Sequence, residues 1–248
     1  MGMIQLGRHR PSYVAWLAVI VPVVAMVLGY AVYERFGAPT GHFALLREYW
    51  ADPEAHDDWA IHAATRCGNA PFLMPSDGFI AFFWGDRYLT GRRHQGIDIF
   101  GPTGPDGLGE TPVVAAYDGY LTRLAEWKSA VILRHPRDPL MPGRQIWTFY
   151  THMADLQGNS FVQPKYPAGT NEVHVGAGEL LGYQGNYSGD PGNATGMHVH
   201  FSIVLDNGRG EFMNELAIEN TLDPSPYLGI DVNGVSIGGQ VAVCPDGQ

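Results

Sequence analysis

A run of 21 uncharged residues from Tyr13 to Tyr33 constrains this chain more than any other feature of its sequence. As an α-helix with a rise of about 1.5 Å per residue, the run would extend roughly 30 Å, which matches the hydrocarbon core of a bilayer. Arg8 and Arg10 precede it, and this positive charge places the N-terminus in the cytoplasm. We therefore expect a cytoplasmic segment at 1–12, a transmembrane anchor at 13–33 and an extracytoplasmic part from residue 34 onward.

A cleaved signal peptide is the main alternative for this run. Signal peptides carry an apolar region of about 7–15 residues that ends at a small-residue cleavage site. The run here is longer, and Tyr30-Ala31-Val32-Tyr33 is a poor cleavage site. A buried core helix is a weaker alternative, because the uncharged run is long and follows a basic N-terminus. The expected localisation is thus the cell membrane, crossed once, with the rest of the chain on its outer side.

The charge balance excludes two classes of partner. The chain has 15 Lys and Arg residues against 25 Asp and Glu residues, which gives a formal net charge of −10. Nucleic acids are held mainly by Lys and Arg contacts to phosphate, so we expect no nucleic-acid binding. The same balance argues against docking on anionic lipid through a basic patch.

Two cysteines, Cys67 and Cys244, rule out a disulfide-dense scaffold and a cysteine-rich zinc finger. The expected location is oxidising, and the two residues lie near the two ends of the outer segment, so we expect that they can pair. Such a bond would close a loop of roughly 180 residues, worth about 4–5 kcal/mol in the chain-entropy model.

The outer segment changes character at about Pro71. Residues 34–70 carry apolar residues at helical spacing, broken at Asp52-Pro53, and predict a linker of one or two short helices. From Pro71 the chain shows short alternating runs bounded by Gly, Pro, Asp or Asn, which indicate an antiparallel all-β domain and not βαβ units. These runs are 79–84, 96–100, 112–121, 130–135, 145–152 and 198–205. The predicted fold is mainly β, an antiparallel β-sheet domain at 71–230 with short linker helices and an N-terminal transmembrane helix.

Three stretches rich in Gly and Pro, at 101–111, 135–145 and 182–196, are expected to be loops. The last of them is long enough to border a groove. The tail at 231–248 is Gly-rich, and we expect it to be loosely ordered.

Histidine spacing gives the functional signal. His198 and His200 are two residues apart, so in a strand both imidazoles point to one face. His94 and Asp98 are four apart, about 13 Å along a straight strand, so they can share a metal only if the chain bends, most easily at Gly96. Two His and one Asp are a suitable set for catalytic zinc, which keeps one position for water. A lone strand histidine is usually a core or surface residue, but the two motifs together, flanked by Gly-rich loops, favour a metal site.

Six blocks of sequence between Pro71 and Leu228 occur in the order found in one family of enzymes. They are RRHQGIDI (92–99), TPVVAAYDGYL (111–121), FYTHMADL (149–156), VGAGELLGYQGN (175–186), TGMHVHFSI (195–203) and DPSPYL (223–228). With these blocks the chain resembles the LytM/lysostaphin-type zinc metallopeptidases, which cleave peptide cross-bridges in bacterial cell walls. It departs from the family pattern at Met197, where Pro is usual, and at Ser202, where Glu is common. The loops at 101–111 and 185–195 are also longer.

The resemblance implies a role for individual residues. His94, Asp98 and His200 match the zinc ligands, and His152 and His198 match the two non-ligand histidines that activate the water and steady the transition state. Tyr88 is the candidate for a loop tyrosine that helps polarise the scissile carbonyl. The remaining histidines are expected away from the zinc: His42, His56, His62, His135 and His174.

The resemblance thus implies a membrane-anchored, Zn²⁺-dependent endopeptidase that hydrolyses peptide cross-links of peptidoglycan. Two alternatives stay open. The chain could be a non-catalytic regulator of other wall hydrolases, although relatives of that kind typically lack one of the five positions that are all present here. It could also be a zinc endopeptidase with a protein substrate, which the longer loops would allow.

Overall fold

The computed structural model describes residues 40–87 and 91–245. Contacts divide the chain into a unit at Met1–Gly41 and a unit at His42–Gln248, and only the second is described below. The expected anchor at 13–33 and the candidate Tyr88 lie outside the described residues. Among the helices that the structure describes, none is both long and apolar enough to cross a membrane.

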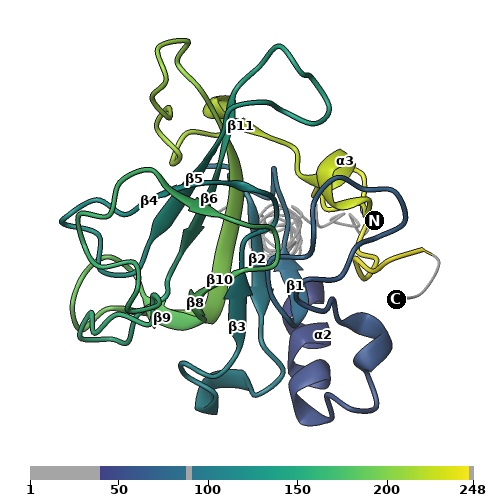
Figure 1. The fold of residues 1–248 in the computed structure, drawn as a ribbon. Helices are drawn as coiled ribbons and strands as arrows, with labels where there is room; N and C mark the ends of the chain where they lie inside the picture. The colour runs from purple at the N-terminus through teal and green to yellow at the C-terminus, as the bar shows by residue number, and fades with distance from the viewer. Residues whose placement is uncertain (1–39, 88–90, 246–248) are drawn as a thin grey trace, which may run out of the picture. The chain divides into compact units, whose positions relative to one another are not determined.

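An antiparallel β-sheet forms the body of the domain (Figure 1), in agreement with the predicted mainly-β fold. Its strands follow the order β1-β2-β10-β6-β5-β4-β7, and β9 and β11 also pair with β10. The bounds are β1 Phe79–Phe82, β2 Ile97–Phe100, β10 Ala194–Leu205, β6 Ile146–Thr151, β5 Val131–His135, β4 Gly119–Thr122, β7 Val173–Val175, β9 Gly185–Tyr187 and β11 Thr221–Leu222. β3 (Pro112–Val114) and β8 (Leu180–Tyr183) form a separate two-stranded sheet.

β10 is the longest described strand and contributes to both faces of the sheet. Val199, Phe201 and Ile203 are fully buried in the main hydrophobic core. Because side chains alternate along a strand, His198 and His200 lie on the opposite face. One strand thus supplies the core with apolar groups and the other face with imidazoles.

Part of the segment expected as a helical linker packs on the sheet. α2 (Thr40–Ala51) buries Leu46 and Tyr49, and the Tyr49 ring stacks on Phe79 of β1 with 5.8 Å between centroids. The Trp50 indole donates a hydrogen bond of 2.9 Å to the Gly101 carbonyl. One turn of 3₁₀-helix, η1 (Asp57–Trp59), follows. This segment is therefore part of the domain's packing and not only a connection.

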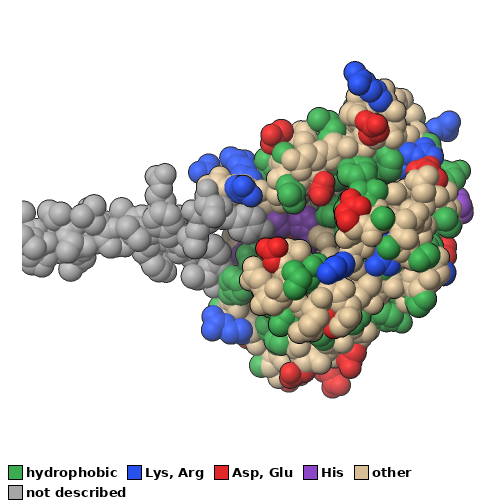
Figure 2. Space-filling model, turned by 90° about the vertical axis from the view of Figure 1, so that its left-hand side faces the viewer, with side chains coloured by type: hydrophobic (Ala, Val, Ile, Leu, Met, Phe, Trp, Pro, Cys, Tyr) green, Lys and Arg blue, Asp and Glu red, His purple; other side chains and the backbone are tan. Residues whose placement is uncertain are grey.

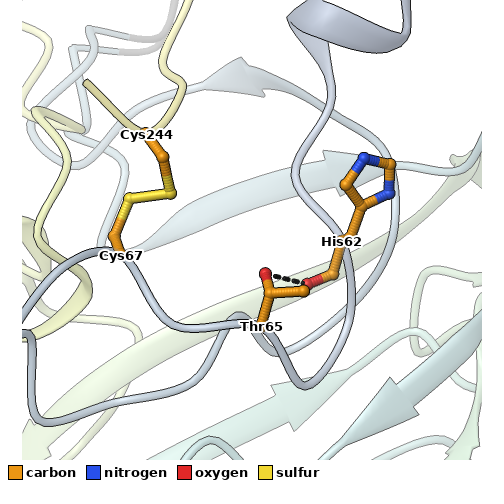
Figure 3. Close-up of a disulfide and its surroundings, with 4 residues drawn as sticks. All are labelled: His62, Thr65, Cys67 and Cys244. Carbon is orange, nitrogen blue, oxygen red and sulfur yellow. Dashed lines mark hydrogen bonds between the residues drawn. A yellow bond between two sulfur atoms is a disulfide. The ribbon is translucent and has the colours of Figure 1, made fainter. Parts of the chain in front are cut away.

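The C-terminal tail is better ordered than its glycine content suggests. Val232, Ile237 and Ala242 are buried in the main core, which explains why a stretch expected to be loose holds its place. The end of the tail is fixed by a disulfide between Cys67 and Cys244, with 5.4 Å between their Cα atoms (Figure 3). The expected pairing of the two cysteines is confirmed.

The stretch at 182–196 was expected to be a loop, and this is wrong for most of its length. It contains the end of β8, all of β9 and the start of β10. β9 is short and carries only one apolar side chain, so its sequence has no alternating pattern to indicate a strand. It is held by pairing with β10, where Gly185 lies opposite His198. β7 was also not expected, and two of its three side chains are exposed.

His135 at the end of β5 is a structural residue. It is fully buried, and its Nδ1–H donates to the Asp118 carbonyl at 2.8 Å while Nε2 lies 2.9 Å from Thr148 Oγ1. Burial lowers the pKa of this imidazole from 6.5 to about 4, so it stays neutral in the folded protein. Its position is explained by packing and two hydrogen bonds, without a ligand.

The disulfide should stabilise the fold substantially. We expect the double variant Cys67→Ala, Cys244→Ala to lose about 2–5 kcal/mol of unfolding free energy, because a very long loop is no longer closed in the unfolded chain. Urea unfolding of oxidised wild type and variant measures the difference. Adding a reductant should lower the stability of the wild type only. Equal stabilities would mean that the bond contributes nothing.

Acid should destabilise the fold through His135. Its lowered pKa means that the unfolded chain takes up this proton first, so its contribution is complete above pH 6.5 and is lost as the pH falls towards 4. The loss should be about 3 kcal/mol. Urea unfolding at several pH values between pH 4 and 7.5 measures this loss. Between these limits the unfolding free energy of His135→Gln should fall by about 3 kcal/mol less than that of the wild type. Parallel pH profiles for the two proteins would contradict this account.

Candidate metal centre

The register of three strands brings the candidate ligands together. His200 on β10 lies opposite Asp98 on β2 in one ladder and opposite Thr151 on β6 in the other. His152 follows directly after β6, and His94 lies in the segment just before β2. Residues more than 100 positions apart in the sequence therefore meet at one place on the sheet.

Gly96 makes the bend that the spacing of His94 and Asp98 required. The chain bends at this residue immediately before β2 begins. A Cβ atom here would lie 2.1 Å from the Phe201 carbonyl oxygen, so only glycine allows the chain to pass so close to β10. The bend brings His94 Nε2 to 3.0 Å from Asp98 Oδ1.

Three ligand atoms form a nearly regular triangle. His94 Nε2, Asp98 Oδ1 and His200 Nδ1 are separated by 3.0, 2.8 and 3.0 Å. Zinc bound tetrahedrally at about 2.0–2.1 Å holds its ligand atoms roughly 3.3 Å apart, so a small opening of this triangle would admit the ion. The side chains are buried, with His94, Asp98 and His200 exposed by 1, 6 and 9%. Two imidazoles and one carboxylate leave a fourth position open, so this donor set fits a catalytic zinc.

Backbone contacts orient His94 towards the centre. Its Nδ1–H donates to the Phe83 carbonyl at 3.1 Å, which leaves the Nε2 lone pair facing Asp98 and His200. The residue is also held by its backbone, since its N–H donates to the Asp86 carbonyl and its carbonyl accepts from Gly85, both at 2.8 Å. The turn at 83–86 thus fixes the ring and its tautomer.

Asp98 is a carboxylate at neutral pH. Burial on its own would raise its pKa, but the charges of His94 and His198 and hydrogen bonds from His200 and His94 hold the pKa well below its usual range. Asp98 therefore supplies one negatively charged ligand group to the centre.

A second pair of histidines lies beside the triangle. The rings of His152 and His198 are 4.5 Å apart, and His198 Nε2 is 3.6 Å from Asp98 Oδ1. The Nδ1–H of His152 donates a hydrogen bond of 2.7 Å to the Tyr187 carbonyl. The Nδ1–H of His198 donates one of the same length to the Gly196 carbonyl. Their Nε2 atoms are left for other partners.

Burial and the neighbouring charges of His198 and His200 lower the pKa of His152 to about 3. His152 is thus neutral at physiological pH, and with Nδ1–H on the Tyr187 carbonyl its lone pair is at Nε2.

His152 sits on an unusual backbone. Its φ of +73° is left-handed, a conformation that non-glycine residues adopt only where the surroundings impose it. Gly185 of β9 packs so closely that a Cβ atom there would lie 2.4 Å from the His152 carbonyl oxygen. β9 therefore helps to hold His152 in this conformation. Spacing in the sequence could not select this residue, and only the family resemblance indicated it.

Five residues that were expected in the centre lie together in the structure: His94, Asp98, His152, His198 and His200. Figure 2 shows histidine side chains gathered in a hollow of the surface. Among the described residues, the group whose ligand atoms converge is His94, Asp98 and His200, and it does not include His42, His56, His62, His135 or His174. The carbonyls of Phe83, Tyr187 and Gly196 were missed, because a backbone group leaves no signal in the sequence.

Comparison with known proteins finds similarity among solved structures only. No protein-family model matches the sequence, and no curated protein matches it either. Fifteen solved chains match. One, from Pseudomonas aeruginosa and assigned as a peptidase M23, is 19% identical with a TM-score of 0.37, over 71% of this chain and 58% of that one.

Two further solved structures are similar to this chain to a comparable degree. Lysostaphin is 21% identical with a TM-score of 0.37, over 68% of this chain and 54% of its own. A mutant catalytic domain of the prophage-encoded M23 protein EnpA from Enterococcus faecalis is 24% identical with a TM-score of 0.35, over 61% of this chain and 94% of its own. This chain spans only a little over half the length of the first two. All three identities are below 25% and all three TM-scores are below 0.5, so the likeness is distant. These solved structures are M23 peptidases and lysostaphin, the family that the six sequence blocks resemble.

Proposed function

We propose that this protein is a membrane-anchored, zinc-dependent endopeptidase that hydrolyses peptide cross-links of bacterial peptidoglycan. The observation that carries the proposal is the triangle of His94, Asp98 and His200 with the pair His152 and His198 beside it. Three ligands alone would suit many metal proteins, whereas two further imidazoles beside the triangle are groups that hydrolysis needs.

The bound zinc would supply Lewis acidity, polarising the scissile carbonyl and lowering the pKa of the attacking water. His152 Nε2 would take up the proton that the water loses and return it to the leaving amine. His198, whose Nε2 lies 3.6 Å from Asp98 Oδ1, would help to stabilise the negative charge that develops on the carbonyl oxygen. Because both Nδ1–H groups are held by carbonyls, the rings need not reorient during the reaction.

The substrate and the location rest on other observations. The six sequence blocks resemble enzymes that cleave cell-wall peptides, and the expected anchor at 13–33 would keep the domain outside the cytoplasm. The Cys67–Cys244 disulfide suits that oxidising side of the membrane. The excess of acidic residues gives no general attraction to anionic wall polymers, so recognition would depend on the peptide itself.

Zinc binding should depend on His94, Asp98 and His200. We expect about one zinc ion per chain in the purified protein, and less than about a tenth of that in Asp98→Asn or His200→Ala, because three protein ligands are needed. Elemental analysis by mass spectrometry measures the content. His174→Ala, which changes a histidine on β7, is the matched control and should keep its zinc. A metal content unchanged in both ligand variants would refute the assignment.

Cleavage should depend on His152 and His198. The full-length protein in detergent, incubated with purified sacculi, should release new peptide termini that mass spectrometry identifies, and a chelator should abolish them. We expect His152→Ala and His198→Ala to retain zinc and to be slower by about 10²–10⁴-fold, because a proton-transfer or charge-stabilising group is lost.

The control for cleavage is again His174→Ala, which should match the wild type. If the folded, zinc-loaded protein released no termini from sacculi, the proposal would be wrong. Hydrolysis of Gly-rich peptides instead would then favour a protein substrate, and no hydrolysis at all would favour a regulator of other hydrolases.

A further inference from the structure

A second pair of side chains from β2 and β10 meets beside the ligands. The two strands are antiparallel, and His200 lies opposite Asp98. Two positions further along, Phe100 is therefore the neighbour of His198 on the same face of the sheet. Their rings stack, with 4.9 Å between centroids and 22° between planes. β2 thus places a carboxylate opposite a ligand histidine and an aromatic ring opposite a histidine outside the ligand set.

The hydrogen bond at Nδ1 does not fix the His198 ring on its own. It joins the ring to the Gly196 carbonyl at 2.7 Å, but the torsion that turns a histidine ring has a broad energy well. The ring plane can therefore tilt about this one bond. An aromatic ring stacked on its face opposes the tilt, because the contact between the two faces would be lost.

Phe100 also lies against the residue that carries the acceptor. A Cβ atom at Gly196 would be 3.2 Å from Phe100 Cε1, which is closer than ordinary van der Waals contact. The Phe100 ring is therefore next to both partners of the hydrogen bond, the His198 imidazole and the Gly196 backbone.

The Phe100 ring is itself held firmly by α2. It is 4% exposed and belongs to a cluster with Leu46 and Tyr49 of that helix. Trp50 packs against it edge-on, with 5.9 Å between centroids. The hydrogen bond from the Trp50 indole to the Gly101 carbonyl fixes the next residue of the chain. A ring that is anchored in this way can restrain its neighbour.

The orientation of His198 matters for the proposed reaction. A group that stabilises developing charge is most effective when it is in place before the charge forms. Misplacement by about 1 Å can cost as much as about 10²-fold in rate. His198 Nε2 lies 3.6 Å from Asp98 Oδ1, so a tilt of the ring would move this nitrogen relative to the metal centre.

We propose that Phe100 is a positioning residue of the centre, whose stacked ring holds the His198 imidazole in the orientation that hydrolysis requires. Trp50 and the cluster on α2 support it, so this helix contributes to the reaction without touching the ligands. The effect on rate rests on the proposed function. The position of the His198 ring does not, because it can be measured in a protein that cleaves nothing.

The kinetic test removes the ring and keeps an apolar side chain. For Phe100→Leu in the full-length protein in detergent, acting on soluble cross-linked wall fragments, we expect kcat to fall about tenfold with KM unchanged. The zinc content should stay the same, because all three ligands are kept. Phe100→Tyr retains the ring and should recover most of the lost kcat.

The matched control is Phe149→Leu. Phe149 is 6% exposed and lies on β6, on the other side of β10 from β2, where its ring packs against Trp127. The substitution removes the same ring at similar burial from the same face of the sheet. It should leave kcat close to that of the wild type.

The spectroscopic test uses the same zinc-loaded, full-length protein with ¹³C-labelled histidine. The His198 ring signals are identified by their loss in His198→Ala. The face of a stacked aromatic ring shifts such proton resonances upfield, so they should move downfield in Phe100→Leu and stay in place in Phe149→Leu. The signals of His135 on β5 are the internal reference and should not move.

A second variant covers the case in which Phe100→Leu does not fold. Gly196→Ala keeps every ring and the carbonyl acceptor, but its methyl group would press on Phe100 Cε1. It should shift the His198 signals and lower kcat in the same direction as Phe100→Leu, by a smaller amount.

Unchanged His198 signals in both Phe100→Leu and Gly196→Ala would overturn the proposal. An equal loss of kcat in Phe100→Leu and Phe149→Leu would also overturn it, because the effect would then be general packing. So would a raised KM with unchanged kcat, which would mean that Phe100 contacts the substrate. If the wild type cleaves nothing, the proposed function fails, whereas the shift of the His198 signals still decides whether Phe100 orients this ring.

Discussion

Pairing of β10 with β2 on one side and with β6 on the other determines where the groups of the metal centre lie. His200 is opposite Asp98 in the first ladder and opposite Thr151 in the second. Side chains alternate along a strand, so a slip of one residue in either ladder would turn the ligand to the other face of the sheet. The same slip would move Val199, Phe201 and Ile203 out of the core. The hydrophobic pattern of β10 and its ligand pattern therefore require one and the same register.

Irregular backbone, and not the regular sheet, orients the imidazoles. The carbonyls of Phe83, Tyr187 and Gly196 each accept an Nδ1–H, from His94, His152 and His198 respectively. A carbonyl in a regular ladder would already be used by a neighbouring strand, so these acceptors come from a turn, a short strand and the bulged start of β10. The departures from regular structure near the centre thus fix which nitrogen of each ring faces it.

Much of this organisation is predictable from the sequence, and the exceptions have physical reasons. The strands with alternating apolar residues, the bend at Gly96 and the pairing of Cys67 with Cys244 follow from local pattern and chemistry. β9 escapes prediction because its pairing with β10 depends on long-range contacts. Tyr88 and the anchor at 13–33 remain predictions.

The position of the C-terminal tail sets the order in which the centre can be completed. Val232 and Gly234 exchange backbone hydrogen bonds with Trp84, beside the Phe83 carbonyl that holds His94. Residues near the end of the chain thus support the turn that orients the first ligand. During synthesis His94 emerges long before these residues, so the turn that orients it is complete only after they have followed. A chain that ended before the tail would contain all four histidines and the aspartate of the metal centre. It would still lack part of the backbone that supports the turn holding His94.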